Sequence, residues 1–404
     1  MPDVRQPTRG LAPLFLAGFT TAFGAHGVAS VLGTQTDDIG MTLLGLGVVL
    51  ALYDVAELVL KPVFGALSDR VGAKPIIVGG LTGFVAASLL ALISPTPLVL
   101  AFARLGQGAS AAAFSPASSA AVARLAGKDR LGGYFGQYGA WKSVGYALGP
   151  LIGVALSHWL GIRALYIALA VIATVAAVWA AAGTPSLPVL PKKRSTLTDL
   201  VHGVAQRGFL VPTLLLAVAT GTLAVAVGFL PLMATRLGLN PMVGAGAVAL
   251  LAVASTVVQP LVGRWRDQGR VATGWGSGVA LLASAVAVLA LALWPHLVPL
   301  VVAAAVIGVM VGTLTPLGFA HLADVTPEER MGTTMGNADM GREIGDAGGP
   351  LLIGAIAAAS VLPVAFAALA AIHAAVGGLA WLTLRHGPRT EGAEPAIGSE
   401  NIIT

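Results

Sequence analysis

The sequence contains no cysteine, so disulfide bonds and thiolate metal sites are excluded. Charged residues are also scarce, at 10% of the 404 residues, whereas an ordinary soluble domain has about 25%. A nucleotide-binding P-loop, a zinc-binding H-E-x-x-H sequence and a carboxylate-rich calcium loop are all absent. We therefore expect no metal, no cofactor and no direct drive by ATP.

Hydrophobic residues, in contrast, make up 56% of the chain, and the mean hydropathy is +0.86. Apolar stretches of about 20 residues, the length that crosses a bilayer, recur along almost the whole sequence. The chain is therefore predicted to be an all-α polytopic membrane protein with twelve transmembrane helices. The predicted helices are 11–33, 41–66, 75–94, 97–123, 131–157, 160–182, 209–236, 242–265, 272–293, 296–323, 331–358 and 360–384.

One long polar segment divides these helices into two sets of six. It contains three prolines and the basic run Lys192-Lys193-Arg194. The prediction is an N-terminal six-helix bundle over residues 1–182, a cytoplasmic linker over 183–208, and a C-terminal six-helix bundle over 209–384. The polar segment 385–404 is predicted to be a disordered cytoplasmic tail.

The basic residues predict which side of the membrane each loop faces. If the N-terminus is cytoplasmic, the predicted cytoplasmic segments hold 17 of the 23 lysines and arginines, and the opposite side holds only Arg163 and Arg236. This asymmetry follows the positive-inside rule, so it explains the net charge of +5 without a nucleic-acid partner. We expect a multi-pass protein of a cell (inner) membrane with both termini cytoplasmic.

The two halves of the sequence also resemble each other. The segment from Gly132 to Pro150 and the segment from Gly332 to Pro350 share glycine, proline, amide and basic positions at a constant offset of 200 residues. The second and eighth helices match at an offset of 198, which pairs Asp69 with Asp267. Two parallel six-helix repeats are typical of secondary transporters.

Three short motifs carry a resemblance to a known family. Gly65-Ala66-Leu67-Ser68-Asp69-Arg70-Val71-Gly72 resembles the loop motif between helices 2 and 3 of the major facilitator superfamily. Arg104-Leu105-Gly106-Gln107-Gly108 resembles a second motif of that superfamily, in helix 4. Gly145-Tyr146-Ala147-Leu148-Gly149-Pro150 resembles its helix 5 antiporter motif, and the whole chain is most similar to the twelve-helix drug/proton antiporter group.

The resemblance implies roles for several motif residues. Gly65, Asp69, Arg70 and Gly72 are expected to gate the transporter at its cytoplasmic surface, where the aspartate contacts a neighbouring helix end and basic groups. The second copy around Asp267 departs from the motif and is interpreted as degenerate. The small residues of the helix 5 motif are expected to form a flexible seam between the halves, and simple tight packing is compatible with that role. They are Gly145, Gly149 and Pro150.

Charges inside the predicted helices are the candidate central site. A charge in the bilayer is expensive, so it usually faces a cavity or a partner. Helices 2 and 11 each carry a set of charges spaced by three, four or seven residues, and such residues share one helix face. Five carboxylates and four cations are involved: Asp54, Glu57, Lys61, Arg104, Lys142, Asp339, Arg342, Glu343 and Asp346.

The excess carboxylate in this set is a candidate proton carrier. Asp54 and Asp346 lie nearest the midpoints of their predicted helices, so we favour them, whereas Glu57 lies one turn from Lys61 and fits a permanent ion pair. Arg104 is expected to modulate the carrier, as the resemblance implies. The alternative is a purely structural salt-bridge network. Tyr53, Tyr138 and Trp141 are candidates for lining a cavity, for the core or for contact with lipid.

The predicted function is proton-coupled export of a small molecule, a drug or a polar or charged metabolite, by alternating access. The partners are therefore the substrate, protons and the lipid bilayer. We expect a monomer. The G-x-x-x-G spacings that can mark helix dimerisation are weak evidence in a chain with 52 glycines. A proton-coupled importer and a non-transporting membrane sensor are the alternatives, and an enzyme is excluded by the lack of a nucleophile–base pair.

Overall fold

The computed structural model describes residues 7–34, 40–94, 96–190 and 207–384, which are almost entirely helical. Residues 191–206 of the predicted linker and the whole predicted tail 385–404 lie outside the described residues. The first six helices are α1 (Pro7–Thr34), α3 (Leu43–Val71), α4 (Ala73–Ile93), α5 (Pro97–Ala126), α6 (Leu131–Leu160) and α7 (Ile162–Gly183). The last six are α9 (Arg207–Arg236), α10 (Pro241–Asp267), α11 (Thr273–Leu293), α12 (Leu297–Val325), α13 (Met331–Ala359) and α14 (Leu362–Thr383).

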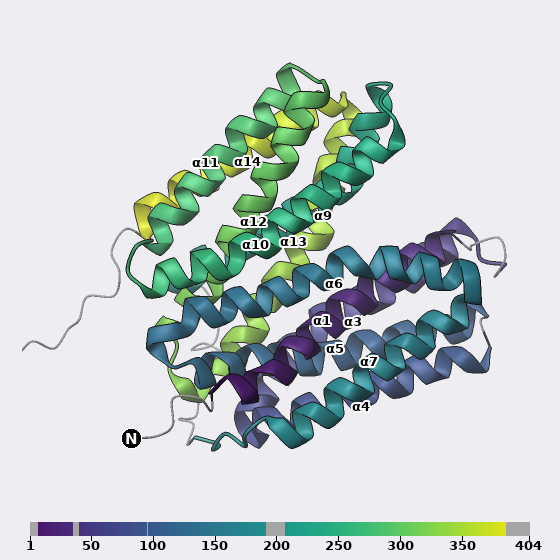
Figure 1. The fold of residues 1–404 in the computed structure, drawn as a ribbon, viewed down its shortest axis with the longest axis vertical. Coiled ribbons are helices and arrows are strands. Elements are labelled where there is room, and N and C mark those ends of the chain that lie inside the picture. Colours follow the sequence, from purple (N-terminus) through teal and green to yellow (C-terminus); the bar gives the residue numbers. More distant parts are fainter. Residues whose placement is uncertain (1–6, 35–39, 95, 191–206, 385–404) are drawn as a thin grey trace, which may run out of the picture.

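These twelve helices form two bundles, as the sequence predicted. In Figure 1 the first bundle (α1 and α3–α7) lies below the second bundle (α9–α14). Short 3₁₀ turns, η1 (Lys128–Arg130) and η2 (Glu328–Arg330), precede α6 and α13 at equivalent places in the two bundles. An even number of helices in each bundle brings the start of α1 and the end of α14 to one face of the molecule, which we name the terminal face.

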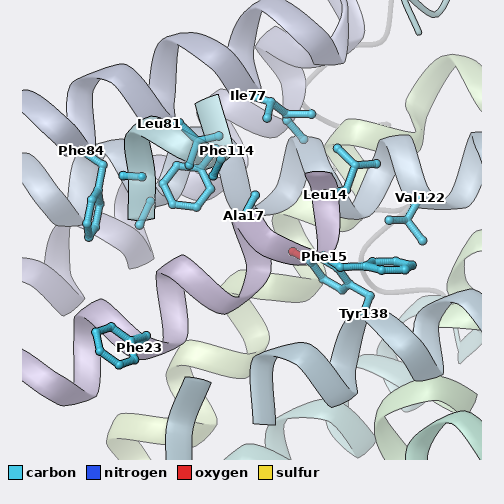
Figure 2. Close-up of a cluster of buried hydrophobic side chains, with 14 of the residues drawn as sticks. Leu14, Phe15, Ala17, Phe23, Ile77, Leu81, Phe84, Phe114, Val122 and Tyr138 are labelled. Atoms are coloured by element: carbon cyan, nitrogen blue, oxygen red, sulfur yellow. The ribbon is translucent and has the colours of Figure 1, made fainter. Parts of the chain in front are cut away.

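The apolar core has two parts. In the first bundle, side chains of α1, α4, α5 and α6 meet, among them Phe23, Leu81, Phe114 and Tyr138 (Figure 2). This part extends across the bundle boundary to Phe319 of α12 and to the start of α13. The second part lies within the second bundle and includes Leu215, Leu281, Leu314 and Phe366.

Ten of the described helices contain a stretch long and apolar enough to cross a membrane. The two long helices outside that set are α3 and α13, which hold seven of the nine candidate central charges. These two helices pack against each other across the bundle boundary, and α6 packs on α10 in the same way. One face of each charged helix therefore meets protein of the other bundle rather than lipid, which lowers the cost of a charge in hydrocarbon.

Helix ends differ most from the sequence prediction at the loop motif. The sequence predicted that α3 ends at residue 66, but the helix continues to Val71. The stretch from Gly65 to Val71 is therefore helical, and the chain turns at Gly72, where φ is +95° and ψ is 149°. A glycine serves this turn because an L side chain rarely adopts a positive φ.

Candidate functional site

The central charges come together at the boundary between the two bundles. Lys61 of α3 is buried, and its Nζ lies 3.2 Å from Oε1 of Glu57 and 2.5 Å from Oε1 of Glu343 on α13. Glu57 is one turn away on the same helix, so the cross-bundle ion pair to Glu343 is the one that joins the halves. A lysine between two carboxylates gives this part of the network one negative charge when all three groups are ionised.

A second ion pair lies within α13. Arg342 Nη1 donates to Oδ1 of Asp339 at 3.3 Å, and both side chains are buried. Ser115 of α5 donates its hydroxyl to Oδ2 of Asp339 at 3.4 Å, so this pair also touches the first bundle. The Arg342 guanidinium stands 5.6 Å from the ring centre of Phe319. Asp339 and Arg342 are thus held from two sides in a buried interface.

Asp54 and Asp346 differ from the other three carboxylates. Among the described residues neither lies in a salt bridge, and Asp54 is exposed while Asp346 is half-buried. Asp54 belongs to α3 of the first bundle and Asp346 to α13 of the second, the two helices that pack against each other across the bundle boundary. Neither carboxylate is fully covered by protein, and neither is held in an ion pair among the described residues.

The two remaining cations are buried without a carboxylate within salt-bridge distance among the described residues. The Arg104 guanidinium lies 4.1 Å from the ring centre of Tyr53, and its Nε and Nη1 have no hydrogen-bond partner. Lys142 of α6 is 5% exposed, and its Nζ lies 5.7 Å from the ring centre of Tyr138. A buried cation without a salt bridge is costly, so Arg104 and Lys142 are both candidates for a functional role.

A pocket lies where α6 faces α9, α10, α12 and α13. Lys142, Ser143 and Tyr146 line it from the first bundle, and Gln259 and Arg342 line it from the second. Further lining residues are Phe135, Tyr138, Gly139, Thr220, Leu223, Val311, Thr315 and Phe319. Thus Tyr138 lines a cavity, whereas Tyr53 is in the core with its ring against Arg104. Trp141 is exposed.

A polar cluster beside this pocket was missed by the sequence analysis. The side-chain amide of Gln259 on α10 donates to the hydroxyl oxygens of Ser143 at 2.7 Å and Ser255 at 3.1 Å. All three residues are buried, and Ser143 belongs to the opposite bundle. The neighbouring Gly139 leaves the space that the Gln259 side chain occupies. Gln259 immediately precedes Pro260, which matches Pro62 at the offset of 198 residues between the second and eighth helices. This proximity to a repeated position was the signal that the sequence offered for Gln259.

Asp69 closes the terminal face between α3 and α13. One carboxylate oxygen accepts from the backbone N–H of Gly332 at 2.6 Å, and the other accepts from the N–H and the hydroxyl of Thr333 at 2.9 and 2.6 Å. These amides belong to the first turn of α13, where N–H groups lack partners within the helix. A carboxylate there also interacts favourably with the helix dipole.

Asp267 makes the equivalent contact on the other flank, between α10 and α6. Its carboxylate accepts from the backbone N–H groups of Gly132 at 2.8 Å and Gly133 at 2.6 Å, at the start of α6. The sequence analysis described this copy of the motif as degenerate and did not include Asp267 as a site residue. The structure corrects that interpretation. The matching offsets of Asp69 with Asp267 and of Gly132 with Gly332 were the signal.

Glycines let the helices approach at both of these crossings. A Cβ on Gly65 would collide with the carbonyl of Gly332, and a Cβ on Gly132 would collide with the carbonyl of Gly263. Among the other motif residues, Arg70 is exposed beside Asp69, and Gly72 forms the turn after α3. The terminal face is therefore closed by two glycine-lined crossings, each with an aspartate at a helix start.

The sequence suggested that the glycines of the helix 5 motif lie between the two halves, but the structure places them within the first bundle. Gly145 and Gly149 of α6 pack against the backbone of Phe19 and Phe23 on α1, within the first bundle. Pro150 follows them inside α6. The seam that these small residues form is therefore an α1–α6 contact. In the second bundle, Gly345 and Gly349 of α13 pack on α9 in the same manner.

Comparison with known proteins identifies the chain's relatives. A model of the Major Facilitator Superfamily matches residues 14–285 and 270–401. The inner membrane transport protein YajR of Escherichia coli is 32% identical over 176 residues, which are 43% of this chain and 37% of that protein. A chloramphenicol resistance protein of Pseudomonas aeruginosa is 32% identical over 253 residues, which are 61% of this chain and 57% of that protein. Each match spans less than two thirds of the relative.

The architecture also occurs in a solved transporter structure. The human organic anion transporter MFSD10 superposes with a TM-score of 0.76 at 18% identity, and the superposition covers 93% of this chain and 99% of that one. At this identity the likeness concerns the fold alone. The twelve-helix arrangement described above is therefore a known transporter architecture.

Proposed function

The chain belongs to the major facilitator superfamily, and we propose that it exports a small molecule across the inner membrane in exchange for protons. The terminal face would be cytoplasmic, because it carries the excess of lysine and arginine in the loops. Substrate would bind between the bundles near the middle of the membrane. Rocking of one bundle against the other would then expose that site alternately to each side.

The observation that carries this proposal is that two of the five central carboxylates form no salt bridge among the described residues. Asp54 and Asp346 lie on opposite sides of the bundle boundary without a salt bridge among the described residues, whereas Glu57, Glu343 and Asp339 are held in ion pairs. A carboxylate that is incompletely buried and unpaired can exchange a proton at little cost to the structure.

Export rather than import is supported by the helix 5 motif and by the printed function of one relative, the chloramphenicol resistance protein. We propose that the substrate is a drug or a polar or charged metabolite and that a single copy of the chain performs transport. Both bundles of one chain contribute charges and lining residues to the central site, so one chain contains every part that the mechanism needs.

Reconstitution in liposomes tests proton coupling directly. The protein is inserted in vesicles that enclose a pH-sensitive dye, a pH gradient is imposed, and chloramphenicol and a broad panel of small molecules are added in turn. We expect proton flux that depends on the substrate and runs opposite to it. Flux of both in the same direction would support the importer, and gradient-independent binding without flux of any compound would contradict both.

The carboxylates are tested by Asp54→Asn and Asp346→Asn, with Asp129→Asn as the matched control on an exposed loop residue. At least one of the first two variants should abolish gradient-driven transport and retain substrate binding, because the amide keeps the shape and cannot carry the proton. Asp129→Asn should transport like the unmodified protein. Wild-type transport in both central variants would refute the assignment.

A further inference from the structure

The pocket between the bundles has an unusual charge. Two of its lining residues, Lys142 and Arg342, are cations, and none of its lining residues is a carboxylate. The Arg342 guanidinium is partly compensated by Asp339 at 3.3 Å. Lys142 has no carboxylate within salt-bridge distance among the described residues; Arg342 repels it, and Asp339 and Glu343 attract it from a longer distance. The side chains that line the pocket itself therefore include two cations and no carboxylate, and the carboxylates lie behind this lining.

The pocket has a volume of about 20 Å³ in this structure, so an organic molecule would enter it only after the bundles separate. The rest of its lining offers partners for the body and the polar groups of such a molecule. Ser143, Thr315 and Gln259 offer hydroxyl and amide groups, while Tyr138, Tyr146 and Phe319 offer aromatic faces and edges. Asp54 and Asp346, the carboxylates that could attract a cation, are not part of this wall. The pocket lining thus offers cations from both bundles, Lys142 on α6 and Arg342 on α13.

We propose that this pocket binds the anionic group of an organic anion between Lys142 and Arg342, with the body of the anion against the neighbouring aromatic side chains. The inference rests on the proposed function, in that the pocket is taken to be the substrate site of the transporter. The anion supplies the direct ion pair that Lys142 does not form among the described residues. Charge-assisted hydrogen bonds from both cations fix its position.

This assignment separates the substrate from the proton. The proton would sit on Asp54 or Asp346, and the anion would sit at the Lys142 wall, so the two would not compete for one group. Exchange of one entering proton for one departing monovalent anion moves two positive charges inward. Exchange of a proton for a monovalent cation moves none, and neither does symport of a proton with a monovalent anion. The class of substrate therefore has an electrical signature.

A binding experiment tests the charge preference. Benzoate, 2-naphthoate and hexanoate are each compared with the uncharged amide and the primary amine of the same skeleton, and thermal unfolding of the purified protein is followed. A ligand that binds the folded state raises the unfolding temperature. We expect the carboxylates to stabilise the protein and the amides and amines to do so far less. Stabilisation by amines alone, or by none of the three carboxylates, would overturn the proposal.

Substitutions of Lys142 give the sharper test. Lys142→Gln should reduce carboxylate affinity about 10–100-fold, the usual range for loss of a hydrogen bond to a charged group, and Lys142→Arg should retain most of it. Without ligand, Lys142→Gln should unfold at the same or a higher temperature, because it removes a buried charge that has no counterion. Lys128→Gln on an exposed turn is the matched control. A drop in unliganded stability with unchanged carboxylate affinity would show that Lys142 is only structural.

Flux measurements distinguish failure of this inference from failure of the proposed function. In vesicles whose membrane potential is clamped with potassium and valinomycin, carboxylate export should accelerate when the interior is negative. Proton-coupled export of amines alone, indifferent to potential, would overturn the anion site and leave proton-coupled export standing. Carboxylate binding that requires Lys142, without proton-coupled flux, would retain the anion site and refute the exporter.

Discussion

Asp69 illustrates how a single carboxylate can hold a whole face of the molecule shut. It accepts three hydrogen bonds from Gly332 and Thr333, which belong to the opposite bundle. Rocking of the bundles must break all three bonds together. A hydrogen bond to a charged group contributes about 1.5–3 kcal/mol, so the aspartate has a large share in the equilibrium between the closed and open terminal face.

We predict that Asp69→Asn shifts this equilibrium toward the open terminal face by roughly tenfold, since the amide cannot accept from two backbone N–H groups as a carboxylate does. Asp267→Asn should act in the same direction, and Asp129→Asn should have no effect. Spin labels at Lys128→Cys and Gln268→Cys, both exposed and in different bundles, report the distance by pulsed EPR. An unchanged distance distribution in the Asp69 and Asp267 variants would contradict the gating role.

At the same scale, the sequence predicted which residue types carry charge in the membrane but not their partners. The spacing of Glu57 and Lys61 suggested their ion pair, because residues four apart share a helix face. The pairing of Lys61 with Glu343 joins residues 282 positions apart, and no local pattern encodes that contact. Asp267 and Gln259 were overlooked because their partners across the bundle boundary, on α6, come close only in the folded chain.

At the scale of the helix, the crossing of α3 with α13 depends on the absence of side chains. A Cβ on Gly65 would meet the carbonyl of Gly332, and a Cβ on Gly336 would meet the carbonyl of Lys61. Two backbones in such close contact leave no flexible group that could move aside. Overpacking of this kind costs about 1–3 kcal/mol, and here the cost falls only on the state with a closed terminal face.

We therefore predict that Gly65→Ala slows transport and populates the open terminal face while the protein still folds. The matched control is Gly79→Ala on α4, where a Cβ would meet nothing within 4 Å; this variant should be neutral or slightly more stable, because alanine favours helix over glycine. Transport rates and the same EPR distance measure both effects. Equal behaviour of the two variants would show that the crossing tolerates a methyl group.

The helices themselves were largely predictable because lipid imposes a simple rule. A segment in hydrocarbon must satisfy its backbone hydrogen bonds internally, so long apolar runs become helices. The failure at the end of α3 has a physical reason as well. Ser68, Asp69 and Arg70 are polar and suggested a loop, but Asp69 finds its partners on α13, so the helix continues to Val71.

At the scale of the whole molecule, the contacts between the bundles form layers of increasing depth from the terminal face. Asp69 and Asp267 close the outermost layer, and the Lys61–Glu343 pair and the Ser143–Gln259 contact lie further along the same helices. Asp54 and Asp346 come beyond these, without such a pair. Opening the terminal face must break the contacts of the outer layers first. Protonation or substrate binding at the central charges could therefore control access to the central site through these layers.

The orientation of these layers in the membrane gives the last prediction. The chain has no native cysteine, so one introduced thiol reports a single site. Lys128→Cys lies on the terminal face and Ser360→Cys at the opposite end of α13, and both positions are exposed. A membrane-impermeant maleimide should label Ser360→Cys in intact cells and Lys128→Cys only after the membrane is opened, because the basic loops keep the terminal face cytoplasmic. The reverse labelling pattern would place the contacts of Asp69 on the outer side of the membrane. The side to which each conformation opens would then be the opposite of the one proposed here.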